Sequence, residues 1–276
     1  MIKYLLFFFA IMIMAQPDVQ LEHTVYFPMV ANKNGCSDKS GVALGAISES
    51  AFNELCLSNW YEYNLIPYDR FNGSDRYYVY WCDEYIDPDG RIYIMRQQML
   101  DNHDFDFSGY VIFFNEWGYT NQCGATEDQY ISEFQWLKEH YPYAKLIVGN
   151  TYGHDHLYGY ARLRLIHDLI VGAGYNWNTD IYGVGIHDYT LTDPAVAIEA
   201  LRELQSSWGS NHPVYVTEFV THNLDEYLSY YEAQPEVKAW FWFLPCNMND
   251  EYDLLTNDCT DTLTNLGLQM RGLNTR

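Results

Sequence analysis

The sequence predicts a single (β/α)₈ barrel, and three features of the chain support this fold class. Eight apolar, β-rich runs recur along residues 40–276, and segments with helical spacing separate most of them. The runs are apolar on both faces, as in parallel strands covered by helices. The length also fits, because single α/β barrels commonly have ~250 residues. An open doubly wound sheet usually has a Gly-rich loop after its first strand, and none follows the first run here.

The expected strands, in chain order, are Gly41–Ile47, Trp60–Tyr63, Tyr77–Trp81, Gly109–Phe114, Lys145–Gly149, Ile181–Ile186, Pro213–Phe219 and Ala239–Leu244. Two of the intervening helices have clear ends. One begins after Thr126 and ends before Pro142, with apolar residues at helical spacing between them. The other begins at Pro194 and is closed by Gly209. The helix after the second strand has the weakest pattern.

The chain begins with a lysine at position 3 and an apolar run up to Ala15, which then gives way to polar residues. This pattern is typical of a secretory signal peptide, and the run is shorter than the ~20 residues of a spanning helix. An uncleaved anchor or a lipid attachment stays open as an alternative. We therefore expect residues 1–15 to be a signal peptide, 16–39 an N-terminal extension with a strand-like run at Thr24–Val30, and 40–276 the barrel domain. The mature protein would be secreted or held at the cell surface.

The net charge of −22 limits the partners of this chain. Nucleic acids and anionic membranes are bound by clustered Lys and Arg, so we expect no nucleic acid and no membrane contact beyond the signal peptide. The acidic residues are spread along the chain, which indicates a solubilising surface. A neutral substrate and a monomeric state fit this composition best.

The six cysteines form an even set in a chain that is expected to be exported, so disulfides are plausible. Six bonded cysteines allow 15 pairings. The single pairing that we favour joins Cys246 to Cys259 across a short loop. No Cys-x-x-Cys occurs, so the sequence gives no sign of a zinc ribbon or a thioredoxin-type motif.

Two of the predicted strands end in glutamate, and these residues are the candidate catalytic groups. Glu116 follows the fourth strand and Glu218 ends the seventh. In a barrel, the carboxyl ends of the strands face the active site, and a carboxylate on a buried strand is costly without a partner or a task. A retaining glycosidase needs such a pair, one to attack the anomeric carbon and one to protonate the leaving oxygen. A salt bridge or a helix cap would be the structural alternative for either residue alone.

Other strand ends carry polar and aromatic side chains that suit a carbohydrate cleft. Asn115 lies beside one glutamate and could hold a sugar 2-hydroxyl, while Thr217 lies beside the other. Aromatic rings can stack on the C–H faces of sugars, although each ring taken singly is more often part of a core. The candidate substrate-binding residues are Asn115, His187, Tyr189, Trp242, Trp60 and Trp81.

The strand ends resemble those of clan A glycoside hydrolases. The fourth strand ends in Phe-Asn-Glu, the sixth in Ile-His-Asp-Tyr and the seventh in Val-Thr-Glu-Phe, and the eighth contains Ala-Trp-Phe. Over about residues 40–270 the chain is similar to the compact catalytic-core family that includes family 128 endo-β-1,3-glucanases, which has a Ser-Trp-x-Tyr-Asn pattern comparable to residues 58–64. This family commonly has proline after Asn-Glu, where this chain has Trp117.

The resemblance implies a retaining glycoside hydrolase that cleaves a β-linked polysaccharide, with β-1,3-glucan as the expected substrate and no cofactor. It also implies roles for individual residues. Glu116 would be the acid/base, Glu218 the nucleophile and Asn115 a substrate-binding residue. His187 and Tyr189 would belong to the subsite at the scissile bond, with Trp242 as a stacking platform.

The sequence allows four other interpretations. The run Asp101–Ser108 nearly matches the catalytic motif of family 18 chitinases, but its last position is Ser108 instead of the required acid, so we reject it. The segment 154–156, His-Asp-His, could bind zinc, but no third ligand is evident nearby, so we expect no metal. A non-catalytic carbohydrate-binding barrel would use the aromatic residues without needing two glutamates, and a structural surface protein would need neither.

Overall fold

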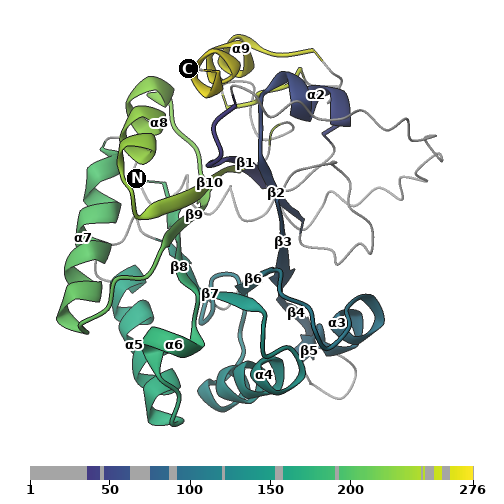
Figure 1. The fold of residues 1–276 in the computed structure, drawn as a ribbon, viewed down its shortest axis with the longest axis vertical. Helices are drawn as coiled ribbons and strands as arrows, with labels where there is room; N and C mark the ends of the chain where they lie inside the picture. Colours follow the sequence, from purple (N-terminus) through teal and green to yellow (C-terminus); the bar gives the residue numbers. More distant parts are fainter. Residues whose placement is uncertain are drawn as a thin grey trace. The chain divides into compact units, whose positions relative to one another are not determined.

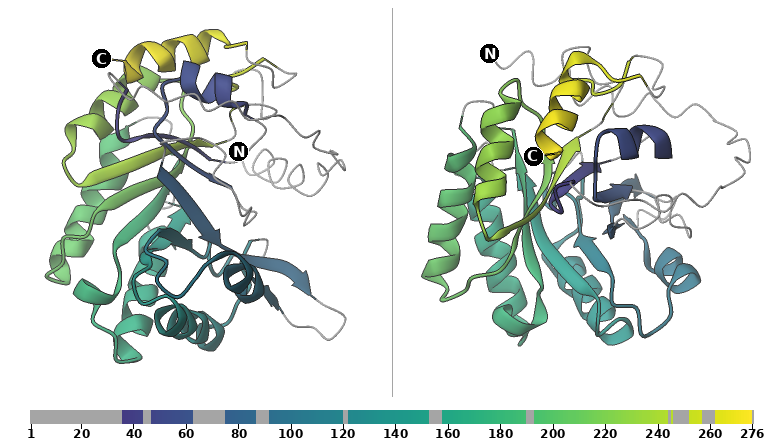
Figure 2. Two further views of the ribbon diagram at one scale, coloured as in Figure 1. Left: turned by 45° about the vertical axis from the view of Figure 1, so that its right-hand side comes forward. Right: turned by 45° about the horizontal axis from the view of Figure 1, so that its top comes forward.

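The computed structural model describes residues 36–43, 47–62, 75–86, 92–119, 122–152, 158–189, 193–243, 245, 252–256 and 262–275. Eight strands close into one barrel in the order β1-β10-β9-β8-β7-β6-β3-β2 (Figures 1 and 2). Every neighbouring pair is parallel. The strands are β1 (Ser40–Ala43), β2 (Asn59–Glu62), β3 (Asp75–Tyr80), β6 (Tyr110–Phe113), β7 (Lys145–Tyr152), β8 (Gly183–Asp188), β9 (Val214–Phe219) and β10 (Val237–Phe243). The predicted (β/α)₈ barrel and its eight strands are confirmed.

Helices follow the strands and cover the outside of the barrel (Figure 1). In the described part of the chain they are α2 (Glu49–Glu54), α3 (Arg96–Asn102), α4 (Glu127–His140), α5 (Tyr158–Gly172), α6 (Trp177–Asp180), α7 (Pro194–Ser207), α8 (Leu224–Ala233) and α9 (Asn265–Asn274). The two helices with clear sequence signals begin as expected. Thr126 and Gln129 form a capping box at the start of α4. Asp193 caps α7, and Pro194 occupies its first turn.

An antiparallel hairpin of β4 (Cys82–Ile86) and β5 (Ile92–Ile94) follows β3 and lies outside the barrel sheet. We did not predict it, although residues 87–90 read Asp-Pro-Asp-Gly between two β-rich runs, which is a turn signal. The expected helix after the second strand and the run Thr24–Val30 lie outside the described residues. Of the expected extension, residues 36–39 are described, and Ser37 donates a backbone hydrogen bond to Asn274.

Aromatic side chains from different strands fill the barrel interior. The ring of Tyr77 lies 4.5 Å from that of Tyr110, 5.8 Å from Tyr215 and 5.0 Å from Phe241, between centroids. All four residues point inward from β3, β6, β9 and β10, because inward and outward side chains alternate along a strand. The interior is therefore a packed core.

Two disulfides join described cysteines: Cys36 to Cys56 and Cys82 to Cys123. The favoured pair, Cys246 and Cys259, lies outside the described residues, as does the expected signal peptide. Disulfides persist in oxidising compartments, so the two bonds are consistent with secretion. Among the described helices, none has the length and apolar character to cross a membrane.

Candidate active site

The strand β8 has a bulged neighbour on each side. On β7, Gly149 pairs with Gly185 and Thr151 with Ile186, so Asn150 is an extra residue. On β9, Val216 pairs with Ile186 and Glu218 with His187, so Thr217 is the extra residue. Because side chains alternate along a strand, one extra residue moves the next side chain to the other face. The bulge at Thr217 thus turns Glu218 into the barrel mouth, towards β8.

The backbone of the turn after β6 places Glu116. Phe114 and Glu116 have φ angles of 53° and 45°, in the left-handed region that is uncommon for such residues. The first of these breaks the alternation of the strand, since Phe113 and Phe114 stack on each other at 4.4 Å and both pack against Tyr130 of α4. The Glu116 N–H then donates to the carbonyl of Asn150 at 3.0 Å. The turn is therefore fixed by packing on one side and by β7 on the other.

These strand ends bring both glutamates to one histidine. Nδ1 of His187 lies 3.0 Å from Oε1 of Glu116 and 3.3 Å from Oε2 of Glu218. One side-chain ligand atom from each residue lies within 4.8 Å of the other two. The three residues are buried, with exposed fractions of 6%, 0% and 3% for Glu116, His187 and Glu218. The two carboxylates that the sequence predicted lie at the ends of different strands, and the structure thus places them side by side.

The charges of the site act strongly on His187. Burial alone would lower the pKa of its imidazole, but the charge of Glu218 and the hydrogen bond and charge of Glu116 outweigh it, so the pKa is raised. Its other ring nitrogen, Nε2, is buried and has no hydrogen-bond partner in the described part of the chain. The shared proton therefore lies on Nδ1, between the carboxylates.

Two tyrosines hold Glu218. The hydroxyl of Tyr189 donates to Oε2 at 2.6 Å. Burial and the neighbouring Glu218 charge raise the pKa of this phenol well above its usual value, so it stays protonated as a donor. The hydroxyl of Tyr61 lies 2.7 Å from the carbonyl of Thr217 and 3.4 Å from Oε1 of Glu218. Tyr189 therefore binds Oε2 directly, while Tyr61 lies beside Oε1 and is anchored to the backbone of Thr217.

Tyr61 was not among the predicted site residues, although the sequence contained a signal for it. It lies on β2 directly after Trp60, and successive side chains point to opposite faces of a strand. The predicted Trp60 takes the outer face, where the guanidinium of Arg76 lies 4.9 Å from its ring. Only one of the two aromatic residues can face the mouth, and it is Tyr61.

Side chains also alternate along β10, and Trp242 points to the outer face, away from the carboxylates. Its indole N–H donates to the carbonyl of Tyr252 at 3.1 Å, and its ring packs edge-on against Phe219 at 5.2 Å. Trp242 is fully buried. The next residue, Phe243, lies on the inner face, where its ring is 6.3 Å from that of Tyr189.

Two further predicted residues lie at the strand ends. Asn115 is buried, with an exposed fraction of 3%. Trp81 is partly buried directly after β3, and its backbone N–H lies 3.4 Å from Sδ of Met95. The structure thus brings Glu116, Glu218, His187 and Tyr189 together, with Asn115 adjacent to Glu116 in the chain.

Glu116, His187 and Glu218 could each offer one ligand atom to a metal ion. The His187–carboxylate distances are also those of hydrogen bonds, so the same arrangement is satisfied by a proton. The other candidate, residues 154–156, lies outside the described residues. We therefore keep the expectation of a site that works without a metal.

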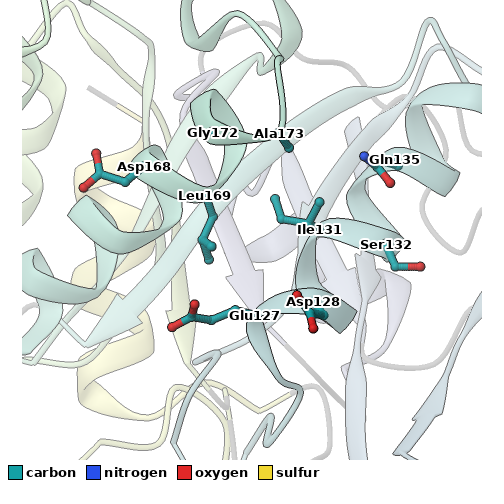
Figure 3. A pocket seen from close by; sticks show the side chains of 9 residues that line it. All are labelled: Glu127, Asp128, Ile131, Ser132, Gln135, Asp168, Leu169, Gly172 and Ala173. Atoms are coloured by element: carbon teal, nitrogen blue, oxygen red, sulfur yellow. The ribbon is translucent and has the colours of Figure 1, made fainter.

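A groove on the helical layer is separate from this site. It has a volume of about 320 Å³ and lies between α4 and α5. In Figure 3, Ile131 and Leu169 face the space between the two helices, while Glu127 and Asp128 lie at one end. None of the residues that line this groove belongs to the carboxylate site.

No family model and no curated protein sequence matches this chain. Solved structures do match. A GH128 (subgroup I) endo-β-1,3-glucanase from Amycolatopsis mediterranei, in complex with laminaripentaose, is 13% identical with a TM-score of 0.63, covering 86% of this chain and 100% of that chain. A GH128 (subgroup II) endo-β-1,3-glucanase from Pseudomonas viridiflava is 20% identical with a TM-score of 0.61, covering 87% and 99%.

A third similar structure is a GH128 (subgroup VII) oligosaccharide-binding protein from Trichoderma gamsii. It is 14% identical with a TM-score of 0.58, covering 90% of this chain and 97% of that chain. At these identities the likeness concerns the fold. It confirms that the chain folds into a barrel similar to that of family 128 glycoside hydrolases, the family that the strand ends resemble.

Proposed function

We propose that this protein is a retaining glycoside hydrolase that cleaves a β-1,3-glucan, with Glu116 as acid/base and Glu218 as nucleophile. One observation carries the proposal: the two buried carboxylates meet at His187, with one oxygen of each within 4.8 Å of the other. Retaining enzymes hold their two carboxyl groups ~5–5.5 Å apart, whereas inverting enzymes leave ~6.5–9.5 Å for a water. The short separation supports double displacement.

In the first step, the ionised Glu218 attacks the anomeric carbon and forms a glycosyl ester. The bond from that carbon to the glycosidic oxygen breaks, and Glu116 gives its proton to the departing oxygen. In the second step, Glu116 takes a proton from water while the water oxygen attacks the same carbon. The ester bond then breaks and Glu218 leaves as a carboxylate.

The neighbouring groups have separate tasks in this scheme. Tyr189 and Tyr61 hold the oxygens of Glu218 and so fix the direction of its attack. His187 shares its Nδ1 proton between the carboxylates while Glu116 changes between acid and base. Asn115 lies next to Glu116 in the sequence, and we assign its side chain to the sugar 2-hydroxyl, where hydrogen bonds strengthen in the transition state.

The substrate class rests on charge and on the similar structures. A net charge of −22 favours a neutral ligand. One similar glucanase is described with laminaripentaose bound. Trp81 and Phe243 could offer apolar faces to a glucan at the mouth, since both follow the inward alternation of their strands.

The test is a panel of neutral β-glucans with β-1,3, β-1,4 and β-1,6 linkages, followed by detection of new reducing ends. We expect activity on the β-1,3-glucan, and ¹H NMR of the first product should show the β-anomer before mutarotation. Glu218→Gln should lower turnover by roughly 10³-fold or more while the glucan still binds. A first product in the α-form would contradict double displacement.

A second candidate is a non-catalytic protein that binds oligosaccharides, as one similar structure is described. Such a protein would bind a β-1,3-gluco-oligosaccharide in calorimetry without producing reducing ends. Glu218→Gln would then change little. The paired carboxylates favour the hydrolase, because binding alone has no need of two buried acids that face each other.

We also propose that the protein is exported and works as a monomer. The two disulfides fit an oxidising compartment. N-terminal sequencing of the mature protein should begin close to Gln16, and light scattering should give the mass of one chain. A mature protein that keeps its first residues would favour the uncleaved anchor.

A further inference from the structure

The bulge residue Asn150 of β7 contacts the turn that carries the proposed acid/base through both its backbone and its side chain. Its carbonyl accepts the backbone N–H of Glu116 at 3.0 Å. Its side-chain amide, Nδ2, lies 3.2 Å from each of three carbonyl oxygens, those of Phe113, Phe114 and Ile147. Asn150 therefore binds both ends of the turn that sets the direction of Glu116.

The backbone and the close packing around Asn150 restrict the conformation of its side chain. It is fully buried and has a φ of 45°. Asparagine tolerates this left-handed conformation better than most residues. Its Oδ1 lies against Gly185 of β8, where an added Cβ would come within 1.8 Å of this oxygen. The side chain fills the space that the missing side chain of Gly185 leaves.

We propose that Asn150 is the positioning residue for Glu116, and that it holds the acid/base towards His187 and the glycosidic oxygen. This inference rests on the proposed hydrolase function. Asn150 itself touches no reacting atom. It fixes the backbone on both sides of Asn115, up to the N–H of Glu116, and a displacement of about 1 Å at a catalytic group can lower turnover ~10²-fold.

The first variant is Asn150→Gly. Glycine adopts a left-handed φ without strain, so the bulge can persist while the three side-chain hydrogen bonds are lost. The matched control is Asn59→Gly. Asn59 is also a buried asparagine whose Nδ2 binds two carbonyls, those of Asp38 and Ser40 at 2.9 and 3.0 Å, but it lies at the opposite end of the barrel, where β2 begins.

The readout separates acid/base positioning from a general loss of structure. An unactivated β-1,3-glucan needs protonation of its leaving oxygen, whereas an aryl glycoside with an acidic phenol leaves without it. We expect Asn150→Gly to lower kcat on the glucan ~10²-fold, to change KM little, and to lower bond cleavage of the aryl substrate much less. Added azide, a nucleophile that needs no general base, should restore turnover of the aryl substrate.

Asn59→Gly should affect both substrates equally or not at all. Equal losses on the two substrates in Asn150→Gly would overturn the proposal, as would the same selective loss in the control. Gly185→Ala gives a second approach, because its methyl group displaces the Asn150 side chain without replacing it. It should reproduce the selective loss if it folds.

An NMR measurement can test the positioning role of Asn150 without any enzymatic activity, and so independently of the proposed function. In protein labelled at histidine with ¹⁵N, the Nδ1 signal of His187 reports its hydrogen bond to Glu116. Asn150→Gly should shift or broaden this signal, and Asn59→Gly should leave it unchanged. If the wild type hydrolyses no glucan but the signal shifts, the hydrolase proposal fails and the positioning stands. An unchanged signal overturns the positioning in either case.

Discussion

Nδ1 of His187 lies 3.0 Å from Oε1 of Glu116 and 3.3 Å from Oε2 of Glu218, so one ring atom faces both carboxylates. With Nε2 buried and unpartnered in the described part of the chain, a single proton at Nδ1 serves two acceptors. The proposed acid/base and the proposed nucleophile thus accept from the same ring nitrogen, and a movement of either carboxylate changes the hydrogen bond of the other.

The first prediction concerns stability and pH. The pKa of His187 is raised in the folded protein. Its contribution to stability is therefore complete below the unfolded value of about 6.5 and is lost as the pH rises through the folded-state pKa. Urea unfolding of the wild type and His187→Gln from acidic to alkaline pH should give a difference in unfolding free energy that shrinks with rising pH. A difference that is constant across this range would contradict the raised pKa.

The second prediction concerns the hydroxyl of Tyr189, which donates to Glu218 at 2.6 Å. Tyr189→Phe should lower kcat by ~10²-fold, as removal of one preorganised donor does in other enzymes. Tyr160→Phe is the control, since the Tyr160 hydroxyl also donates a short hydrogen bond, at 2.7 Å, but to the backbone carbonyl of Ala197. Each variant should lose about 1 kcal/mol of unfolding free energy, and only the first should lose turnover. Equal kcat values would exclude this role of Tyr189.

The third prediction concerns metals. If protons satisfy Glu116, His187 and Glu218, then activity should survive prolonged treatment with a chelator. Added Zn²⁺ should inhibit in competition with substrate, because the same three side chains can offer ligand atoms. Loss of activity on chelation, with recovery when a metal is added back, would show that the site depends on a metal.

The fourth prediction compares the two disulfides. Cys82–Cys123 closes a loop of 41 residues and Cys36–Cys56 one of 20, for which chain entropy gives ~4 and ~3 kcal/mol of stability. The stabilities should therefore fall by similar amounts when each pair is replaced by serine. Activity should fall only with the first pair, since the carbonyl of Cys123 accepts the N–H of Gly118, close to Glu116. Equal activities of the two variants would contradict this coupling.

The parts that the sequence predicted well follow from regular patterns. Eight apolar runs and the capping signals of α4 and α7 were sufficient for the barrel, because patterning and caps act locally. Glu116 and Glu218 could be found because parallel strands of a barrel bring their carboxyl ends to one face. The hairpin β4–β5 was not predicted, because its strands are short and follow β3 directly, without an intervening helix.

Trp60 and Trp242 were predicted to bind substrate, but the structure places neither side chain beside the carboxylates. Trp60 and Trp242 are on the correct strands but on the outer face, while their neighbours Tyr61 and Phe243 face inward. The face of a residue depends on register, and a bulge changes the register by one residue. Neither the bulge at Asn150 nor that at Thr217 has a strong signal in the local sequence. The direction of the Glu218 side chain could therefore be determined only from the structure.

Asn150 and Gly185 occupy a single volume between β7 and β8, and this has a consequence for how the barrel can vary over evolution. A larger residue at position 185 displaces the Asn150 side chain from its present position, because the added Cβ and Oδ1 would overlap, and a smaller residue at position 150 removes this conflict. The two positions should therefore change together among relatives. A library that randomises both at once should recover folded proteins at pairs such as alanine with glycine, which neither single substitution would reveal.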